Sequence, residues 1–408
     1  MATSRGRLAV IFFTVFIDLI GFGIIMPILP YYAQEFGAQG LGFGALVFAF
    51  SGMQFLATAV LGRVSDRIGR RPIILTTTIL NAAGYVLFAF AGSYPLLLFA
   101  RIISGFAGGN ISAAQAYIAD ITTPANRSRG MGMLGAAFGL GFTLGPAIGG
   151  VAAHFGGHMA PGLVAAVLSL ANFVSAYFIL PESLSLEHRT RRRLLDFGHI
   201  GDVLSRRRLR PLMALWGLAP FAFAGYTVAL PFYANRVFHW TETNLSVFFI
   251  EVGLTSALVQ GLLFGKLAPR FGERGLLILG LAGMSVGIGG VPFLSSGLAL
   301  YAWTFILAFS NSLFAPAATG LVSVYAGPAE QGTVLGAAQA IAALGRSLGP
   351  LALGWGYDRW GGTAAFLIAG GVMALAALAG LALERVSPAM GGTPVAAPAG
   401  DSGHAGVS

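Results

Sequence analysis

Residues Gly62 to Pro72 read GRVSDRIGRRP, a short basic loop between two long apolar runs, and a degraded copy follows about 203 residues later. The copy, Gly265 to Gly275, reads GKLAPRFGERG. Gly62 and Gly69 supply the tight backbone that so short a loop needs. A loop of this kind, present twice half a chain apart, indicates a duplicated bundle of membrane-spanning helices.

The composition also places the chain in a membrane. Of its 408 residues, 56% are hydrophobic and only 10% are charged, whereas soluble domains average about 25% charged residues. So little charge cannot cover a soluble protein of this size, so we expect lipid around it. The chain has no cysteine, which excludes disulfides, thiolate metal sites and cysteine nucleophiles.

The apolar runs are numerous enough for twelve spans, because a hydrocarbon core about 30 Å thick needs roughly 20 apolar residues per helix. We expect spans near residues 8–32, 43–62, 72–92, 95–120, 130–153, 160–180, 210–235, 243–265, 275–295, 298–326, 331–356 and 362–384. The sequence therefore predicts an all-α membrane protein with an N-terminal six-helix bundle (1–180), a cytoplasmic linker (181–209), a C-terminal six-helix bundle (210–385) and a disordered cytoplasmic tail (386–408).

Arginine is unevenly divided between the two sets of loops. One set holds only Arg236 and Arg359, and the other holds the basic loop, its copy, the run Arg189 to Arg193 and the run Arg206 to Arg210. By the positive-inside rule the crowded side is cytoplasmic, and an even number of spans places both termini there. The net charge of +9 therefore indicates topology rather than nucleic-acid binding. The high Ala, Gly and Arg content, with Lys266 as the one lysine, suggests a GC-rich bacterial genome. We therefore expect the membrane to be a bacterial inner membrane.

Other segments repeat with nearly the same spacing as the loop. Leu29–Ala33, LPYYA, returns as Leu230–Ala234, LPFYA, and Gly145-Pro146 returns as Gly349-Pro350. Parallel six-helix halves place a binding site near the middle of the membrane, where the halves meet. Rocking of one half against the other would then give alternating access to that site.

Several motifs resemble those of major facilitator transporters. The Gly62 loop resembles their loop between the second and third helices, and Gly135–Gly150, GAAFGLGFTLGPAIGG, resembles the fifth-helix motif of antiporters. Asp18–Pro30, Arg101–Gly109 and Pro181–Leu184 resemble segments of their first, fourth and sixth helices. The resemblance implies the major facilitator fold, with two six-helix halves related by pseudo-two-fold symmetry. It points in particular to the tetracycline/proton antiporters and their multidrug relatives.

The sequence departs from the tetracycline exporters at two acidic positions. Gly84 stands before Tyr85 in the third span, and Met284 lies near the position of an acid in the ninth. A neutral or cationic lipophilic drug therefore fits as well as tetracycline. The resemblance implies proton-coupled efflux of small lipophilic drugs across the bacterial inner membrane by alternating access. The alternatives are a proton-coupled symporter of a sugar or other small metabolite and a non-transporting membrane sensor or scaffold.

The sequence contains no nucleotide-binding motif and no catalytic domain, so transport would be driven by an ion gradient. We expect no cofactor other than the proton gradient, no metal site and no enzymatic activity. The expected partners are the lipophilic substrate, protons and membrane lipid, without nucleic acid. The protein is expected to be a monomer.

Four ionisable residues are expected inside the membrane, where charge is costly and therefore a functional candidate. They are Asp18, Arg101, Glu251 and Arg346, with one acid and one base in each half. We hypothesise that Asp18 is the main proton carrier and that Arg101 adjusts its proton affinity. Glu251 and Arg346 would form a second pair. In the alternative interpretation both pairs are structural ion pairs that fix helix packing.

The basic loop is expected to act as a gate. Asp66 can accept hydrogen bonds from backbone N–H groups at the start of a neighbouring helix and pair with Arg127 or Arg129, and the resemblance makes this a cytoplasmic latch of the outward-open state. In the second copy Pro269 replaces the acid, so the latch is one-sided. The gating residues predicted in this region are Gly62, Asp66, Arg67, Gly69, Arg70, Arg71, Asp120, Arg127 and Arg129.

The fifth span is expected to pack closely against a helix of the other half, because glycine lets backbones approach. Pro146 removes one backbone hydrogen bond and would kink the helix. Ordinary small-residue packing is the alternative. The residues assigned to this contact are Gly141, Gly145, Pro146, Gly149 and Gly150.

A substrate pocket is expected to be mostly apolar with a few polar groups. Amides that stand alone in apolar helices, with nearby aromatic residues, are the candidates, although such amides also hydrogen-bond neighbouring helices. The predicted substrate-binding residues are Phe22, Gln54, Asn110, Gln115, Phe138, Tyr226, Gln260, Asn311, Phe314 and Gln339.

Overall fold

The computed structural model describes residues 4–184, 198–326 and 330–383, and no strand occurs within these ranges. The helices are α1 (Ser4–Ile25), α2 (Leu29–Glu35), α3 (Gly40–Ile68), α4 (Arg70–Ala89), α5 (Tyr94–Gly108), α6 (Ile111–Ile121), α7 (Pro124–Gly156), α8 (Met159–Ile179), α9 (Gly198–Ser205), α10 (Arg210–Phe238), α11 (Glu242–Leu258), the π-helical segment η2 (Val259–Leu263), α12 (Phe264–Gly289), the short η3 (Val291–Phe293), α13 (Gly297–Tyr325) and α14 (Gln331–Leu381).

Nine helical segments in the described part of the chain are long and apolar enough to cross a membrane. Two of them, Glu242–Gly289 and Thr333–Leu381, have 48 and 49 residues, which is enough for two crossings of roughly 20 residues each. Each contains a break at a glycine in a non-helical conformation, Gly272 or Gly361. With α7, a 33-residue helix, these segments make up the predicted two sets of six crossings.

Three predicted spans are interrupted in the structure. The span 8–32 is divided between α1 and α2 by a turn at residues 26–28, around Pro27, and the span 243–265 passes into η2. The span 95–120 is divided between α5 and α6 at Gly109 and Asn110. Proline lacks the backbone N–H that a helical hydrogen bond needs, and glycine loses more conformational entropy in a helix than any other residue. Both residues therefore favour a break in a helix. The break after α5 places Asn110 beside α1.

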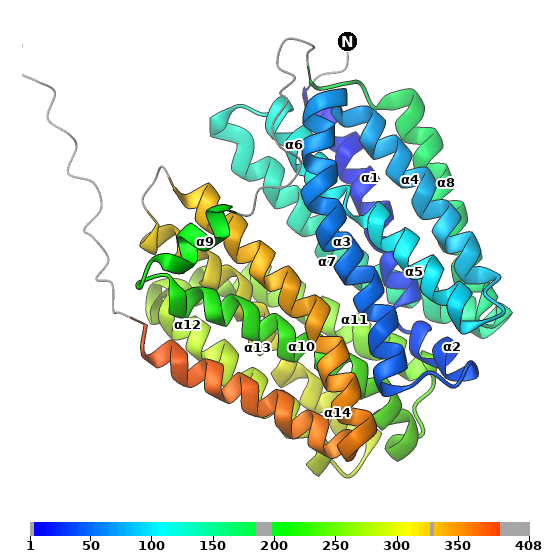
Figure 1. Cartoon of the computed structure of the whole chain (residues 1–408), viewed down its shortest axis with the longest axis vertical. Coiled ribbons are helices and arrows are strands. Elements are labelled where there is room, and N and C mark those ends of the chain that lie inside the picture. The colour runs from blue at the N-terminus through cyan, green and yellow to red at the C-terminus, as the bar shows by residue number, and fades with distance from the viewer. Residues whose placement is uncertain (1–3, 185–197, 327–329, 384–408) are drawn as a thin grey trace, which may run out of the picture.

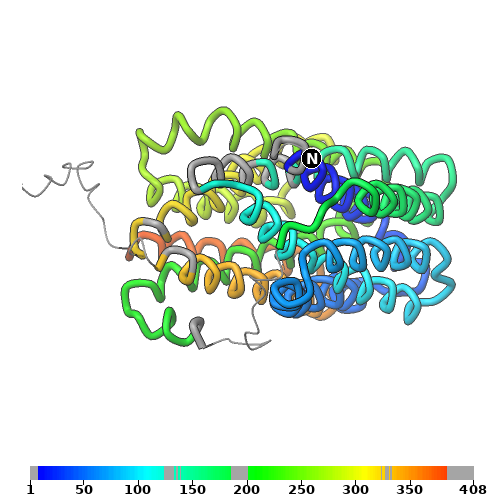
Figure 2. The backbone as a smooth tube through the Cα atoms, turned by 90° about the horizontal axis from the view of Figure 1, so that it is seen from above, coloured from blue at the N-terminus to red at the C-terminus, as the bar shows by residue number. Residues whose placement is uncertain are grey.

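In the described part of the chain the buried hydrophobic residues form three clusters, and the cluster around Tyr85 and Phe88 also includes Val228 and Phe232 of α10. The N-terminal half packs around Tyr85, Phe88 and Tyr117, and the C-terminal half packs around Trp216 and Phe366. The two bundles are joined by contacts of α3 with α14 and of α7 with α11, and Figures 1 and 2 show them side by side. The end of the predicted linker forms α9, which packs on the C-terminal half. Residues 185–197 and the tail 386–408 lie outside the described residues.

The duplication is visible in the backbone as well as in the sequence. Gly69 (φ 115°) is matched 203 residues later by Gly272 (φ 67°), and Gly157 (φ 58°) is matched 204 residues later by Gly361 (φ 81°). Each glycine lies at the junction of two crossings, where a positive φ reverses the chain at little steric cost. The repeat inferred from residue types therefore also holds for local conformation.

Candidate functional site

The carboxylate of Asp18 lies at the meeting point of three crossings in the N-terminal half. The side-chain amide of Asn110, at the α5–α6 break, donates a hydrogen bond to one oxygen at 2.6 Å. The amide of Asn172, on α8, donates to the other oxygen at 3.2 Å and to the backbone oxygen of Thr14 at 2.9 Å. Asp18 is partly exposed. An acid inside an apolar bundle is thus stabilised by neutral donors that come from two separate helices.

Asn110 is among the predicted substrate-binding residues, and Asn172 is not among the predicted site residues. Both are single amides in apolar helices, so the same signal could have found both. What the sequence did not show is that the break between α5 and α6 and the middle of α8 face the same point on α1. In the structure Asn110 is a partner of the candidate proton carrier.

Arg101 forms no ion pair with Asp18 in the structure, and its effect on the proton affinity of Asp18 stays a prediction. Its side chain is buried, with 4% exposed, and its guanidinium carbon lies 4.4 Å from the centre of the Phe50 ring. Among the described residues Arg101 forms no ion pair and its Nε atom has no hydrogen-bond partner. The cation instead faces an aromatic ring of α3, which attracts it electrostatically. The oxygens of Asp18 accept hydrogen bonds from the amides of Asn110 and Asn172.

The expected second pair is also apart. Glu251 lies on α11 and is partly exposed, and Arg346 lies on α14 and is exposed. No ion pair joins them within the described part of the chain. Neither half therefore holds the structural acid–base pair that was the alternative interpretation.

The predicted substrate residues that the structure describes have different surroundings. Phe22 packs against Phe50 and Phe142, with ring centres 5.0 Å and 5.6 Å away, and Gln54 donates to the backbone oxygen of Gly108 at 3.2 Å. Asn311 is partly exposed, and Gln115, Gln260 and Gln339 are exposed. The side chain of Phe138 lies outside the described residues.

Tyr226 and Phe314, two of the predicted substrate residues, are core residues in this structure. Tyr226 is 1% exposed and packs against Phe366, and Phe314 packs against Trp216. Both belong to the core of this half. They were chosen because aromatic residues line pockets, but aromatic residues also fill cores, and only the direction of the side chain separates the two roles. In this conformation both side chains are buried.

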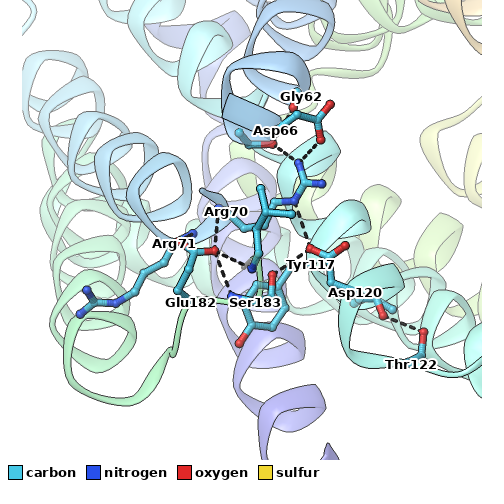
Figure 3. A network of polar contacts seen from close by, with 12 residues as sticks. Gly62, Asp66, Arg70, Arg71, Tyr117, Asp120, Thr122, Glu182 and Ser183 are labelled. Carbon is cyan, nitrogen blue, oxygen red and sulfur yellow. Dashed lines mark hydrogen bonds and ion pairs between the residues drawn. The ribbon is translucent and has the colours of Figure 1, made fainter. Parts of the chain in front are cut away.

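In the structure residues 62–72 are helical except at Gly69, which alone makes the turn between α3 and α4, whereas Gly62 lies inside α3. This segment and the nearby ends of α6 and α8 form a polar network (Figure 3). We call this end of the molecule the arginine-rich face and the opposite end the arginine-poor face. Arg70 is buried and contacts Asp66 at 2.5 Å and Asp120 at 3.2 Å. Ser65 accepts a hydrogen bond from Arg70 at 2.7 Å, and Ser183 donates one to Asp120 at 2.9 Å. One guanidinium thus fixes the ends of three helices.

Glu182, rather than Asp66, caps the neighbouring helix. Its carboxylate accepts hydrogen bonds from the backbone N–H groups of Arg70 and Arg71, at 2.9 Å and 3.2 Å, which begin α4. A carboxylate at this position is favoured by the helix dipole and by the free N–H groups. Asp66, near the end of α3, points instead to the side chain of Arg70 (Figure 3). The helix end could be predicted, but the acid that reaches it comes from about 112 residues away.

The other predicted gating residues lie at this end of the molecule. Arg67 is in the last turn of α3, and Arg71 donates to the backbone oxygen of Tyr177 at 2.6 Å. Gly62 packs against Ser112 of α6. The side chains of Arg127 and Arg129 lie outside the described residues, so the structure does not test their pairing with Asp66.

The glycines of α7 mostly face their own half, which corrects the prediction. A Cβ added at Gly141, Gly145 or Gly149 would lie within 2.7 Å of Leu19, Gly23 or Ile24 of α1. Gly150 alone among the five faces the other half, where a Cβ would lie 2.6 Å from the Ser246 hydroxyl of α11. Residues four apart share one face of a helix, and that face meets α1. Pro146 lies within α7, which continues through it.

The halves are closed against each other at the arginine-poor face. The backbone N–H of Leu41 donates to Asp358 at 2.7 Å, and the Tyr31 hydroxyl donates to the backbone oxygen of Trp240 at 3.1 Å. The rings of Phe43 and Phe232 are 5.3 Å apart. A cavity of about 270 Å³ lies beside these contacts, lined by Gln34, Gln39, Phe232, Asn235, Arg236 and Tyr357.

Comparison with known proteins agrees with this architecture. The family model described as Major Facilitator Superfamily matches residues 11–299 and 252–404. The chain is 30% identical to "Major facilitator superfamily domain-containing protein 10" of Homo sapiens, over 91% of this chain and 92% of that protein. It is 31% identical to "Tetracycline resistance protein, class C" of Escherichia coli, over 85% of this chain and 89% of that protein.

A solved structure is also similar. The crystal structure of the human organic anion transporter MFSD10 (TETRAN) matches with a TM-score of 0.70 and 28% identity, over 93% of this chain and 100% of that one. These proteins are transporters rather than enzymes.

Proposed function

The chain belongs to the major facilitator superfamily, and we propose that it is a proton-coupled exporter of small lipophilic drugs across a bacterial inner membrane. The arginine-rich face and both termini would lie in the cytoplasm. The observation that carries the proposal is the Asp18 carboxylate, partly exposed within the bundle and bound by two amides. The similarity to tetracycline resistance proteins supports the substrate class.

Proton binding to Asp18 would be linked to helix packing through its hydrogen bonds. As a carboxylate, Asp18 accepts from Asn110 and from Asn172. When a proton binds, one oxygen becomes a donor, so the amide facing it has to turn its own oxygen inward or move away. The change is transmitted to the α5–α6 break and to α8. A proton on one residue can thereby alter how α1 packs in the N-terminal half.

The contacts at the arginine-poor face support an alternating-access cycle. Leu41–Asp358 and Tyr31–Trp240 join the halves there, so this conformation would be closed to the outside. A substrate would then enter from the cytoplasm or the inner leaflet. Outward release would require these contacts to break while Asp18 takes up an external proton.

A second candidate substrate class is organic anions. Two arginine side chains in the helix bundles support it. Arg101 and Arg346 form no ion pair among the described residues, although charge inside a membrane is usually paired. A bound organic anion would supply the missing partner. The similar human structure is named as an organic anion transporter. Export of anions and export of neutral or cationic drugs would use the same proton carrier.

The test uses inverted membrane vesicles with an acidic interior and a pH-sensitive dye. Tetracycline, lipophilic cations and lipophilic carboxylates are added to wild type, to Asp18→Asn and to the control Asp202→Asn on α9. We expect at least one drug class to trigger proton efflux in wild type and in the control but not in Asp18→Asn. Drug-driven efflux that persists in Asp18→Asn at normal expression would refute the proton role. A response to sugars or metabolites alone would favour the symporter.

A further inference from the structure

His158 lies between two glutamates that belong to different halves of the molecule. It precedes α8 at the arginine-poor face, and its Nδ1 atom is 2.8 Å from Glu35 at the end of α2. Its Nε2 atom is 3.0 Å from Glu242, the first residue of α11. The ring also packs against Tyr32, with centres 5.4 Å apart. The contact with Glu242 is a direct polar link between the N-terminal and C-terminal halves.

The geometry requires a particular protonation state. A carboxylate can only accept hydrogen bonds, and a neutral imidazole carries one N–H, so it can donate to only one of two carboxylates. Both contacts are hydrogen bonds only when both ring nitrogens carry a proton. The arrangement of the two carboxylates therefore favours the protonated form of His158. Loss of that proton would leave one ring nitrogen facing a carboxylate, with two lone pairs in opposition.

We propose that His158, Glu35 and Glu242 form a proton-binding site that holds the two halves together at the arginine-poor face when the outside is acidic. With a proton bound, His158 ties α2 and the α7–α8 turn to the start of α11. Without it, the link to α11 or to α2 is lost and opening to the outside becomes easier. This site is separate from Asp18 and rests on alternating access, not on the identity of the substrate.

The charges around His158 act in one direction. The hydrogen bond with Glu242 raises the pKa of His158, the charge of Glu35 adds to this, and partial burial opposes both. Tyr32 faces the ring, Tyr31 lies near Glu242, and no arginine or lysine of the described residues forms an ion pair with either glutamate. Since the pKa is raised in the closed state, the stabilisation is complete below about pH 6.5 and is lost as the pH rises through the raised value.

The test measures opening directly and needs no substrate. Because the chain has no cysteine, Ser93→Cys and Ser295→Cys provide two spin labels, one in an exposed turn of each half at the arginine-poor face. Distances are measured from pH 5 to pH 9 in lipid nanodiscs. An Asp18→Asn background removes any response that comes from the other proton site. The variants are His158→Gln, Glu242→Gln, Glu35→Gln and the control His154→Gln, an exposed histidine of the same face.

We expect the long-distance population to grow with pH, about tenfold relative to the closed form, with a midpoint above 6.5. His158→Gln should open at all pH values, Glu242→Gln should lose most of the pH response, and His154→Gln should behave as wild type. A pH response that survives in both His158→Gln and Glu242→Gln would overturn the proposal, and so would a wild type that stays closed at every pH. Drug transport enters neither outcome, so this result and the export proposal can fail independently.

Discussion

The residues around Asp18 show how much a single acid depends on its neighbours. Asn110 and Asn172 hold the carboxylate with amide N–H groups, while Arg101 packs on Phe50 instead. An amide donor stabilises a negative oxygen without neutralising its charge. The carboxylate therefore stays negatively charged and can still bind a proton. A salt bridge at the same place would tend to fix one protonation state.

We expect Asn172→Ala to slow drug-driven proton efflux about 10- to 150-fold, because a hydrogen bond to a charged group contributes roughly 1.5–3 kcal/mol. Initial rates of dye dequenching at matched expression measure the effect. Thr319→Ala, which removes an exposed polar side chain from α13 without touching Asp18, is the control and should stay near the wild-type rate. Equal rates for the two variants would mean that Asn172 does not position the carboxylate.

Gly69 connects α3 to α4 through a backbone conformation with positive φ. It adopts φ 115° and ψ 159°, a region nearly restricted to glycine, and an added Cβ would lie 2.3 Å from the Glu182 carboxylate. We expect Gly69→Ala to lower the free energy of unfolding by about 1–3 kcal/mol from backbone strain, and further through the clash with the cap of α4. Thermal unfolding in detergent, followed by tryptophan fluorescence, measures the loss.

Gly272 provides a matched comparison for Gly69. It has a similar conformation, φ 67° and ψ 160°, but no atom lies within 4 Å of an added Cβ. Gly272→Ala should therefore show the strain alone and unfold at a higher temperature than Gly69→Ala. If the two variants unfold together, the contact with Glu182 contributes nothing to stability.

At the scale of helices, the packing of α7 on α1 is set by three glycines spaced four residues apart. The absence of side chains at Gly141, Gly145 and Gly149 lets the two backbones touch, as small residues do in membrane helices generally. The same spacing on the predicted helix did not reveal which neighbour it faced. The contact with α1 brings the fifth crossing close to the helix that carries Asp18.

Gly149→Ala should destabilise this contact, since the added Cβ would lie 2.3 Å from the backbone oxygen of Ile24. Overpacking of this kind costs about 1–3 kcal/mol. Gly139→Ala, ten residues earlier on α7 with nothing within 4 Å of the added Cβ, should unfold like wild type or at a slightly higher temperature, because alanine favours helix. The melting temperatures of the two variants are compared. A higher melting temperature for Gly149→Ala than for Gly139→Ala would contradict this packing of α7 on α1.

At the scale of the whole molecule, the function depends on whether the two bundles move against each other. They are joined by contacts of α3 with α14 and of α7 with α11. An added Cβ at Gly150 would lie 2.9 Å from the Cβ of Ser246 on α11. A disulfide spans about 3.5–4.5 Å between these atoms, so a small shift would allow one to form.

The double variant Gly150→Cys and Ser246→Cys should therefore lock the halves together. We expect oxidation to abolish drug-driven proton efflux and a thiol reductant to restore it, with free thiols counted in parallel. Each single variant should be insensitive to oxidant, since the chain has no other cysteine. Continued transport by the fully oxidised double variant would show that these helix ends do not separate during the cycle.

The sequence alone determined the class of fold and the division into two related halves, because apolar length, arginine placement and a repeated loop are one-dimensional signals that need no contact information. It also singled out Asp18, since an acid in an apolar run is costly wherever it points. The tertiary structure decided which groups meet: Asn172 with Asp18, Glu182 with the start of α4, the α7 glycines with α1, and His158 with Glu242. These pairs lie from 84 to more than 150 residues apart or depend on which side of a helix faces which neighbour. Only the packing of the helices in three dimensions fixes that choice.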